Sequence, residues 1–165
     1  IFITLITTEQ VKELRDKTGV SVMQCKKALE ETGGDMEKAT ALLLEKSAEI
    51  ANKKSDRTLG AGFISTYVHA TGTTGVMLEL LCETDFVAKN DEFKALARDI
   101  AMHVTATNPK FIKLEDAGEE PESALLEQAF IKNPEVTIKN LLESATQKFG
   151  EKIELSRFVR YSVSE

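Results

Sequence analysis

The spacing of apolar residues along the chain changes near residue 59. Before that point, apolar residues recur every three or four positions, which is the spacing of one face of an α-helix. After it, several runs alternate apolar and polar residues, which is typical of strands with one buried side. The pattern therefore predicts a small helical part followed by a larger part that contains a sheet.

Three short helices are expected in the first part. Each begins at a residue whose side chain can accept hydrogen bonds from free backbone N–H groups: Thr7, Ser21 and Asp35. We expect a three-helix module over residues 1–46, with one small shared core. The polar stretch 47–58 after it predicts a linker or a helical extension.

The second part, residues 59–165, predicts an α+β core that opens with a β-hairpin. Residues 63–70 alternate in polarity and residues 76–82 are almost continuously apolar. Gly72 and Gly75 bracket a turn between the two runs. Two antiparallel strands joined by that turn are the expected result.

Two helices and a third strand complete the predicted core. Asn90 can cap a helix whose apolar spacing runs to Asn108-Pro109, and residues 138–149 repeat the helical spacing. Alternation from Ile153 to Val163 predicts the closing strand of a three-stranded antiparallel sheet packed with helices. The remaining stretches predict an acidic loop and a segment that fits a strand or a helix: residues 113–124 and 125–131.

Composition excludes several classes of protein. The 165 residues are 42% hydrophobic and carry a net charge of −6 at pH 7, whereas a protein that wraps nucleic acid needs a basic surface. No apolar run approaches the length of a membrane span. The apolar opening Ile1–Ile6 lacks the basic flank and the cleavage site of a signal peptide.

No enzyme site emerges from the spacing of reactive residues. A metal site or a Cys-His nucleophile pair could be imagined only from residues far apart in the chain: His69, Cys82, Asp85 and His103. Cys25 and Cys82 both lie among apolar residues, so they are expected to be buried free thiols. We expect no metal, no cofactor and no catalytic residue.

The stretch Thr84–Asn90, between the hairpin and the long helix, is unusually apolar for a turn. Phe86 stands there beside the acid Asp85. One interpretation folds Phe86 back to staple the start of the next helix, near Phe93 or Leu96. The other presents it as an aromatic wedge to a partner, with the charged neighbour at the rim. The residues alone leave both open.

Five runs form an ordered set along nearly the whole chain, from about residue 8 to residue 163. They are VKELRDKTG (11–19), CKKAL (25–29), CETDFVAKN (82–90), IAMHV (100–104) and RFVRY (157–161). This set resembles the translation elongation factor Ts family, with CETDFVAKN similar to its signature.

The resemblance implies a guanine nucleotide exchange factor that binds elongation factor Tu and promotes GDP release. It implies a ubiquitin-associated-like fold for the three-helix module, which would dock on the GTPase through three residues: Arg15, Val22 and Met23. Asp85 and Phe86 would intrude near the magnesium and nucleotide site of the partner. The implied partner-binding set also includes Thr84, Val87 and His103.

The chain departs from the family pattern at two places. Ser21-Val22 stands where a Gly-Met pair is usual, and residues 113–124 are too few for the second core half and helical hairpin of longer members. The short core is compatible with a homodimer in which two chains supply both halves. The expected location is the cytoplasm, or an organelle matrix if a transit segment has been removed.

Two other functions stay open as alternatives. One is a non-catalytic adaptor that holds another protein through the three-helix module. The other is a small enzyme built around His69, Cys82 and His103. Only an exchange factor would accelerate the release of GDP from elongation factor Tu.

Overall fold

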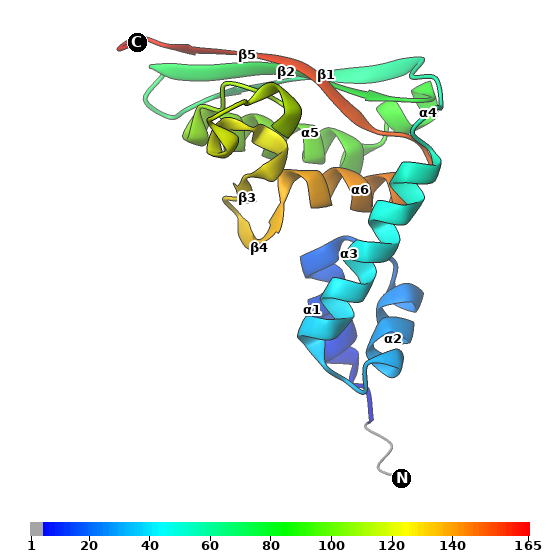
Figure 1. Ribbon diagram of the computed structural model, residues 1–165. Helices are drawn as coiled ribbons and strands as arrows, with labels where there is room; N and C mark the ends of the chain where they lie inside the picture. The colour runs from blue at the N-terminus through cyan, green and yellow to red at the C-terminus, as the bar shows by residue number, and fades with distance from the viewer. Residues whose placement is uncertain (1–4) are drawn as a thin grey trace. The chain divides into compact units, whose positions relative to one another are not determined.

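The computed structural model describes residues 5–165, which divide into two compact units (Figure 1). The first unit takes the chain up to residue 56 together with residues 140–151, and the second takes residues 57–139 and 152–165. Residues 1–4, which belong to the apolar opening Ile1–Ile6, lie outside the described residues. No helix between residues 5 and 165 is long and apolar enough to cross a membrane.

The first unit begins with the three predicted helices, α1 (Thr8–Thr18), α2 (Val22–Glu31) and α3 (Met36–Lys53). The predicted caps are confirmed: the side chains of Ser21 and Asp35 each accept a backbone N–H at the start of their helix. Thr7 forms a complete capping box with Gln10, with hydrogen bonds of 3.2 and 3.0 Å. Such caps satisfy N–H groups that have no partner within the helix.

One small core joins these helices, as predicted. Its members are buried to 8% exposure or less: Val11, Leu14, Val20, Cys25, Ala28, Leu29, Ala39 and Leu43. The helix α3 continues without a break through residues 47–53, which the polar pattern assigned to a linker or a helical extension. The buried hydroxyl of Ser47 donates to Gln147 at 2.5 Å, and Gln147 donates to Gln24 at 2.8 Å. Gln147 lies in α6 (Ile138–Phe149), the second predicted amphipathic helix.

The second unit is built on a three-stranded antiparallel sheet, which confirms the α+β prediction. Its strands are β1 (Ala61–Val68), β2 (Thr74–Cys82) and β5 (Glu154–Ser162), with β2 in the centre. The predicted hairpin joins β1 to β2. Gly72 in its turn has φ = +70°, a conformation that glycine adopts without steric cost.

One helix, α5 (Asp91–Thr107), covers the inner face of this sheet (Figure 1). Asn90 caps it, and Asn108 ends it in a left-handed conformation, as the sequence predicts. The core between them consists of fully buried side chains, chiefly Leu78, Leu80, Phe93, Ile100 and Val104. These apolar residues set the position of the helix relative to β1 and β2.

The third strand contains a β-bulge that the sequence pattern did not reveal. Glu79 pairs with Arg157 but the next residue of β2 pairs with Leu155, so Ser156 is an extra residue on β5. Side chains alternate along a strand, and one extra residue reverses the alternation. Leu155 is therefore buried, whereas Val159, at an odd-numbered position like Leu155, lies on the outer face of the sheet and is 42% exposed.

The region before α6 is more structured than the sequence suggests. The stretch predicted to be an acidic loop contains two short 3-10 helices, Leu114–Asp116 and Pro121–Ser123. The ambiguous stretch 125–131 combines both alternatives, with a 3-10 helix at Leu125–Glu127 and the short strand β3 (Ala129–Phe130). This strand pairs with β4 (Asn133–Thr137) in a second, two-stranded sheet.

Candidate functional site

The corner between β2 and α5 is a single helical turn, α4 (Asp85–Ala88), and not the loop that the sequence predicts. Thr84 caps the turn through its hydroxyl, which accepts from the backbone N–H of Val87 at 3.5 Å. Backbone hydrogen bonds from Ala88 to Thr84 and from Lys89 to Asp85, of 3.2 and 3.0 Å, close it. The corner therefore has a defined backbone conformation.

The side chains of α4 point in opposite directions. Val87 and Ala88 are buried, at 4% and 7% exposure, and attach the turn to the unit. Phe86 is 86% exposed, and Asp85 beside it is also exposed. The staple interpretation is therefore wrong, because a ring packed near Phe93 would be shielded from water. An aromatic side chain held in water on a well-supported turn is typical of an interface anchor.

The thiol of Cys82 belongs to the support of this corner. It is buried, it forms no disulfide, and its Sγ donates to the carbonyl of Thr84 at 3.3 Å. Cys25 is likewise buried and free, and burial raises the pKa of its thiol. Both thiols were predicted to be buried, and both take structural positions.

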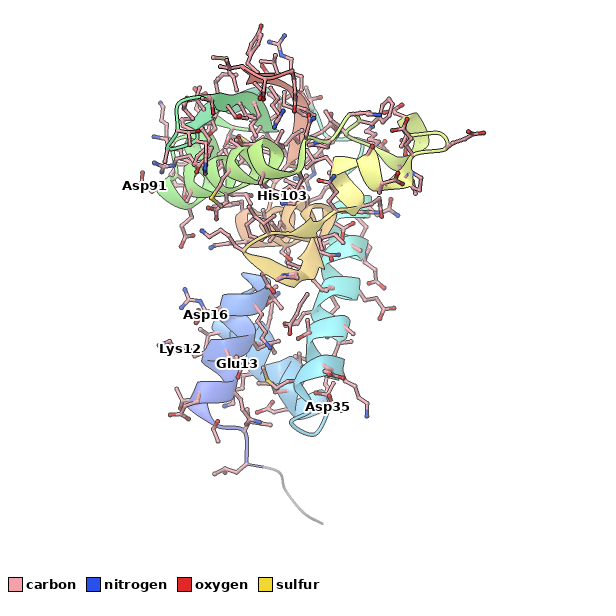
Figure 2. All side chains as sticks on the ribbon, turned by 90° about the vertical axis from the view of Figure 1, so that its left-hand side faces the viewer. Lys12, Glu13, Asp16, Asp35, Asp91 and His103 are labelled. Carbon is pink, nitrogen blue, oxygen red and sulfur yellow. The ribbon has the colours of Figure 1, made fainter. Side chains whose placement is uncertain are left out.

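His103 was expected among the partner-binding residues, but the structure buries its side chain completely. It lies on α5 (Figure 2), where Nε2 lies 2.9 Å from the Oε1 atom of Gln128 and Nδ1 accepts from the backbone N–H of Ile131 at 3.3 Å. Burial lowers the pKa of the imidazole. These contacts connect α5 to the β3–β4 hairpin, so His103 stabilises the core and presents nothing at the surface. Val87 has a similar buried position.

The residues of the imagined enzyme are not brought together in the structure. His69 is exposed, and its Nδ1 atom lies 3.4 Å from the hydroxyl of Tyr67. Cys82 and His103 are both buried, and each forms hydrogen bonds with other residues. In the described part of the chain, no three His, Cys, Asp or Glu side chains are grouped so that they could hold a metal ion.

In the first unit, the three expected contact residues are all exposed. Val22 and Met23 lie in the first turn of α2, and they are 51% and 83% exposed. Arg15 is exposed in the last turn of α1. The same helix carries further charged side chains at exposed positions, including Lys12, Glu13 and Asp16 (Figure 2). Protein interfaces typically combine exposed apolar residues with charged residues at the rim.

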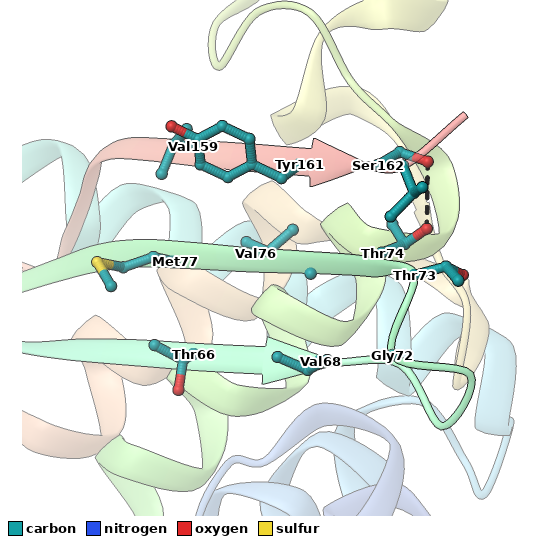
Figure 3. Close-up of a pocket in the computed structure, with 12 residues that line it drawn as sticks. Thr66, Val68, Gly72, Thr73, Thr74, Val76, Met77, Val159, Tyr161 and Ser162 are labelled. Atoms are coloured by element: carbon teal, nitrogen blue, oxygen red, sulfur yellow. Dashed lines mark hydrogen bonds between the residues drawn. The ribbon is translucent and has the colours of Figure 1, made fainter. Parts of the chain in front are cut away.

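One surface was missed by the sequence reasoning: the outer face of the three-stranded sheet. Six large apolar side chains are between 42% and 81% exposed on or beside it: Ile64, Val68, Met77, Val159, Tyr161 and Val163. All of them except Ile64 line a shallow hollow of about 540 Å³ (Figure 3). The available signal was the presence of apolar residues on both sides of β1, where Ile64 and Val68 alternate with Phe63 and Tyr67.

Comparison with known proteins gives a consistent result. The family model described as elongation factor TS matches residues 3–121. The elongation factor Ts of Carboxydothermus hydrogenoformans is 41% identical over 196 aligned positions, which cover 98% of this chain and 90% of that protein. The elongation factor Ts of Thermodesulfovibrio yellowstonii is 43% identical, with 97% of each chain covered. An alignment of 196 positions exceeds the 165 residues of this chain, so that relative has internal residues without a counterpart here.

Exposed apolar side chains on well-supported turns are typical of proteins that act by binding other proteins. The comparisons identify the family. Its model matches more than half of the chain, and the chain in turn covers nearly the full length of the relatives. The chain belongs to the elongation factor Ts family, the nucleotide exchange factors of translation elongation, which are not enzymes.

Proposed function

We propose that this chain binds elongation factor Tu and promotes GDP release by inserting Phe86, with Asp85 beside it, near the nucleotide and magnesium site of that GTPase. The observation that carries the proposal is the 86% exposure of Phe86 on a helical turn whose next two residues are buried. A fixed backbone presents the ring without a large loss of conformational freedom on binding. Apolar area that the free protein exposes to water is buried when the partner binds.

Exchange requires no catalytic group, only a preference for one state of the partner. If the factor weakens GDP binding, GDP must weaken factor binding by the same ratio. A wedge that fits a pocket formed when the nucleotide site opens supplies this preference. Asp85 would bring a negative charge close to the phosphates of GDP, and the repulsion between these like charges disfavours the nucleotide-bound arrangement.

The three-helix module is proposed to supply docking affinity through Arg15, Val22 and Met23. Val22 and Met23 contribute apolar area, and Arg15 contributes a charge at the rim. If only this contact operated, the chain would be an adaptor that binds the GTPase without changing it. Bacterial relatives favour the cytoplasm as the site of action, or an organelle matrix if a transit segment has been removed.

The release of fluorescently labelled GDP from elongation factor Tu tests the proposal. Addition of the chain is expected to accelerate release in a saturable manner, in the presence of excess unlabelled GDP. Binding of the chain to the GTPase without acceleration would contradict the exchange function and support the adaptor. A buffer blank and an equal concentration of an unrelated acidic protein serve as controls.

We further propose that a second copy of the chain covers the outer face of the sheet. The charged residues nearest its centre, Glu79 and Arg157, pair with each other at 3.3 Å, so the face is locally neutral although the chain carries a net charge of −6. Two like-charged chains repel least where they meet through such a face. Gly75, between Val68 and Tyr161, leaves the hollow into which side chains of the second copy can pack.

The variant Met77→Lys is expected to shift the chain from dimer to monomer at micromolar concentration, because it places a charge in the middle of the apolar face. Sedimentation velocity measures the change. Ile131→Lys, at an apolar position of similar exposure outside the sheet, is expected to leave the dimer intact. A wild-type chain that sediments as a monomer over the whole concentration range would overturn the proposal.

A further inference from the structure

Glu83 immediately precedes Thr84, the cap of the turn that carries Asp85 and Phe86. Its Oε1 atom accepts from the backbone N–H of Lys152 at 2.7 Å, and its Oε2 atom lies 3.4 Å from the guanidinium of Arg57. The side chain of Glu83 is only 18% exposed, whereas that of Arg57 is 51% exposed. The hydrogen bond to Lys152 is the shorter contact and the better shielded one, so it is expected to contribute more.

These contacts connect the chain segments at one end of the three strands. Glu83 follows β2, Arg57 precedes β1, and Lys152 precedes β5. In an antiparallel sheet with β2 at the centre, the end of β2 lies beside the beginnings of both neighbours. A single carboxylate therefore fixes the chain segments that converge on the corner.

The backbone of Glu83 is closely packed as well. A Cβ atom added at Gly60 would lie 3.2 Å from the Glu83 carbonyl oxygen, which shows that the segment entering β1 passes directly against it. The next residue, Thr84, caps α4, and its carbonyl accepts from the Cys82 thiol. A shift of Glu83 would therefore displace Thr84 and Asp85 and, through them, Phe86.

We propose that Glu83 is a positioning residue for nucleotide exchange. It holds the corner so that Phe86 is presented in the orientation that opens the partner's nucleotide site. It does not itself touch the GTPase. This inference rests on the proposed function of Phe86 as a wedge, and it assigns a role to a residue outside the expected contact set.

The test is a comparison of exchange kinetics across variants of the full chain. Glu83→Ala is expected to lower the maximal rate of GDP release by about tenfold, because a misplaced group loses much of its effect without losing its chemistry. The concentration that gives half-maximal exchange is expected to change by less than about twofold, because the exposed docking residues are unchanged. Glu83→Gln keeps an acceptor for the Lys152 N–H and is expected to recover most of the rate.

Glu120→Ala is the matched control, since Glu120 is a glutamate of the second unit, outside the three-stranded sheet, that likewise contacts a cation, Lys110, and a polar partner, Ser123. It is expected to exchange GDP at the wild-type rate. Thermal unfolding of each variant identifies the ones that fold, and Glu83→Asp, which keeps the charge but shortens the reach to the Lys152 N–H, replaces Glu83→Ala if that variant does not fold.

The double variant Glu83→Ala/Phe86→Ala separates positioning from general damage. If Glu83 acts through Phe86, the double variant is expected to be as slow as Phe86→Ala alone. Independent, multiplying effects would overturn the positioning role, as would a wild-type maximal rate for both Glu83 variants. If Phe86→Ala itself exchanges normally, the wedge function fails, and that result is distinguishable from a failure at Glu83 alone.

Discussion

Replacement of Phe86 by alanine is expected to slow the maximal rate of GDP release from elongation factor Tu by roughly one hundredfold. Truncation of an aromatic anchor at the centre of an interface costs about 2–4 kcal/mol. Each 1.36 kcal/mol corresponds to about a factor of ten in rate. Since the ring is 86% exposed in the free chain, its removal is expected to leave the fold intact. Stopped-flow measurement with labelled GDP gives the rate.

Leu114→Ala is the matched control for this experiment. Leu114 is also an exposed apolar residue of the second unit, at 47% exposure, and it lies in a different segment. It is expected to exchange GDP like the wild type, which would show that loss of exposed apolar area alone does not explain the effect. Normal exchange by Phe86→Ala, with both variants folded, would contradict the wedge.

The second large effect is expected from the double substitution Val22→Ala/Met23→Ala. Loss of two apolar contacts of about 1 kcal/mol each is expected to raise the concentration for half-maximal exchange by about thirtyfold. The maximal rate is expected to stay near that of the wild type, because the wedge is unchanged. Alanine is the best helix former, so the first turn of α2 is expected to persist. A concentration series in the same GDP-release assay measures both quantities.

Leu5→Ala controls for the loss of an exposed apolar side chain in the first unit, since Leu5 is 82% exposed and lies outside the helices. It is expected to leave both kinetic quantities unchanged. An unchanged half-maximal concentration in the Val22→Ala/Met23→Ala variant would argue that the three-helix unit does not dock through α2. A fall in the maximal rate instead would assign these residues to the opening step.

Local chemistry explains why much of the fold could be predicted from the sequence. A capping residue acts within three positions of itself, so Thr7, Ser21 and Asn90 mark helix starts without knowledge of the rest of the chain. Periodicity is equally local, and it identified the hairpin, α5 and α6. The family signature makes the corner between β2 and α5 the candidate site, although the sequence predicted a loop there and the structure has a helical turn.

Features decided by distant residues could not be predicted in the same way. Which side chains of α4 are buried depends on how the turn packs against the rest of the unit, and the structure buries Val87 and Ala88 and leaves Phe86 exposed. His103 has the polarity of a surface residue, but its partners lie 25 and 28 positions away in the chain. No pattern within one helix reveals such partners, so its burial emerges only from the folded structure.

The bulge at Ser156 has a consequence for how β5 can change. Before it, the odd-numbered Leu155 is buried, whereas after it the odd-numbered Tyr161 is 76% exposed and the even-numbered Arg160 donates to the carbonyl of Thr105 in α5 at 3.2 Å. Both halves carry apolar side chains at odd-numbered positions, so only the extra residue makes these side chains face inward before the bulge and outward after it. Deletion of Ser156 would turn Val159 and Tyr161 towards α5 and send Arg160 outward. A single position thus decides whether the odd-numbered apolar side chains of β5 face this chain's own core or the solvent.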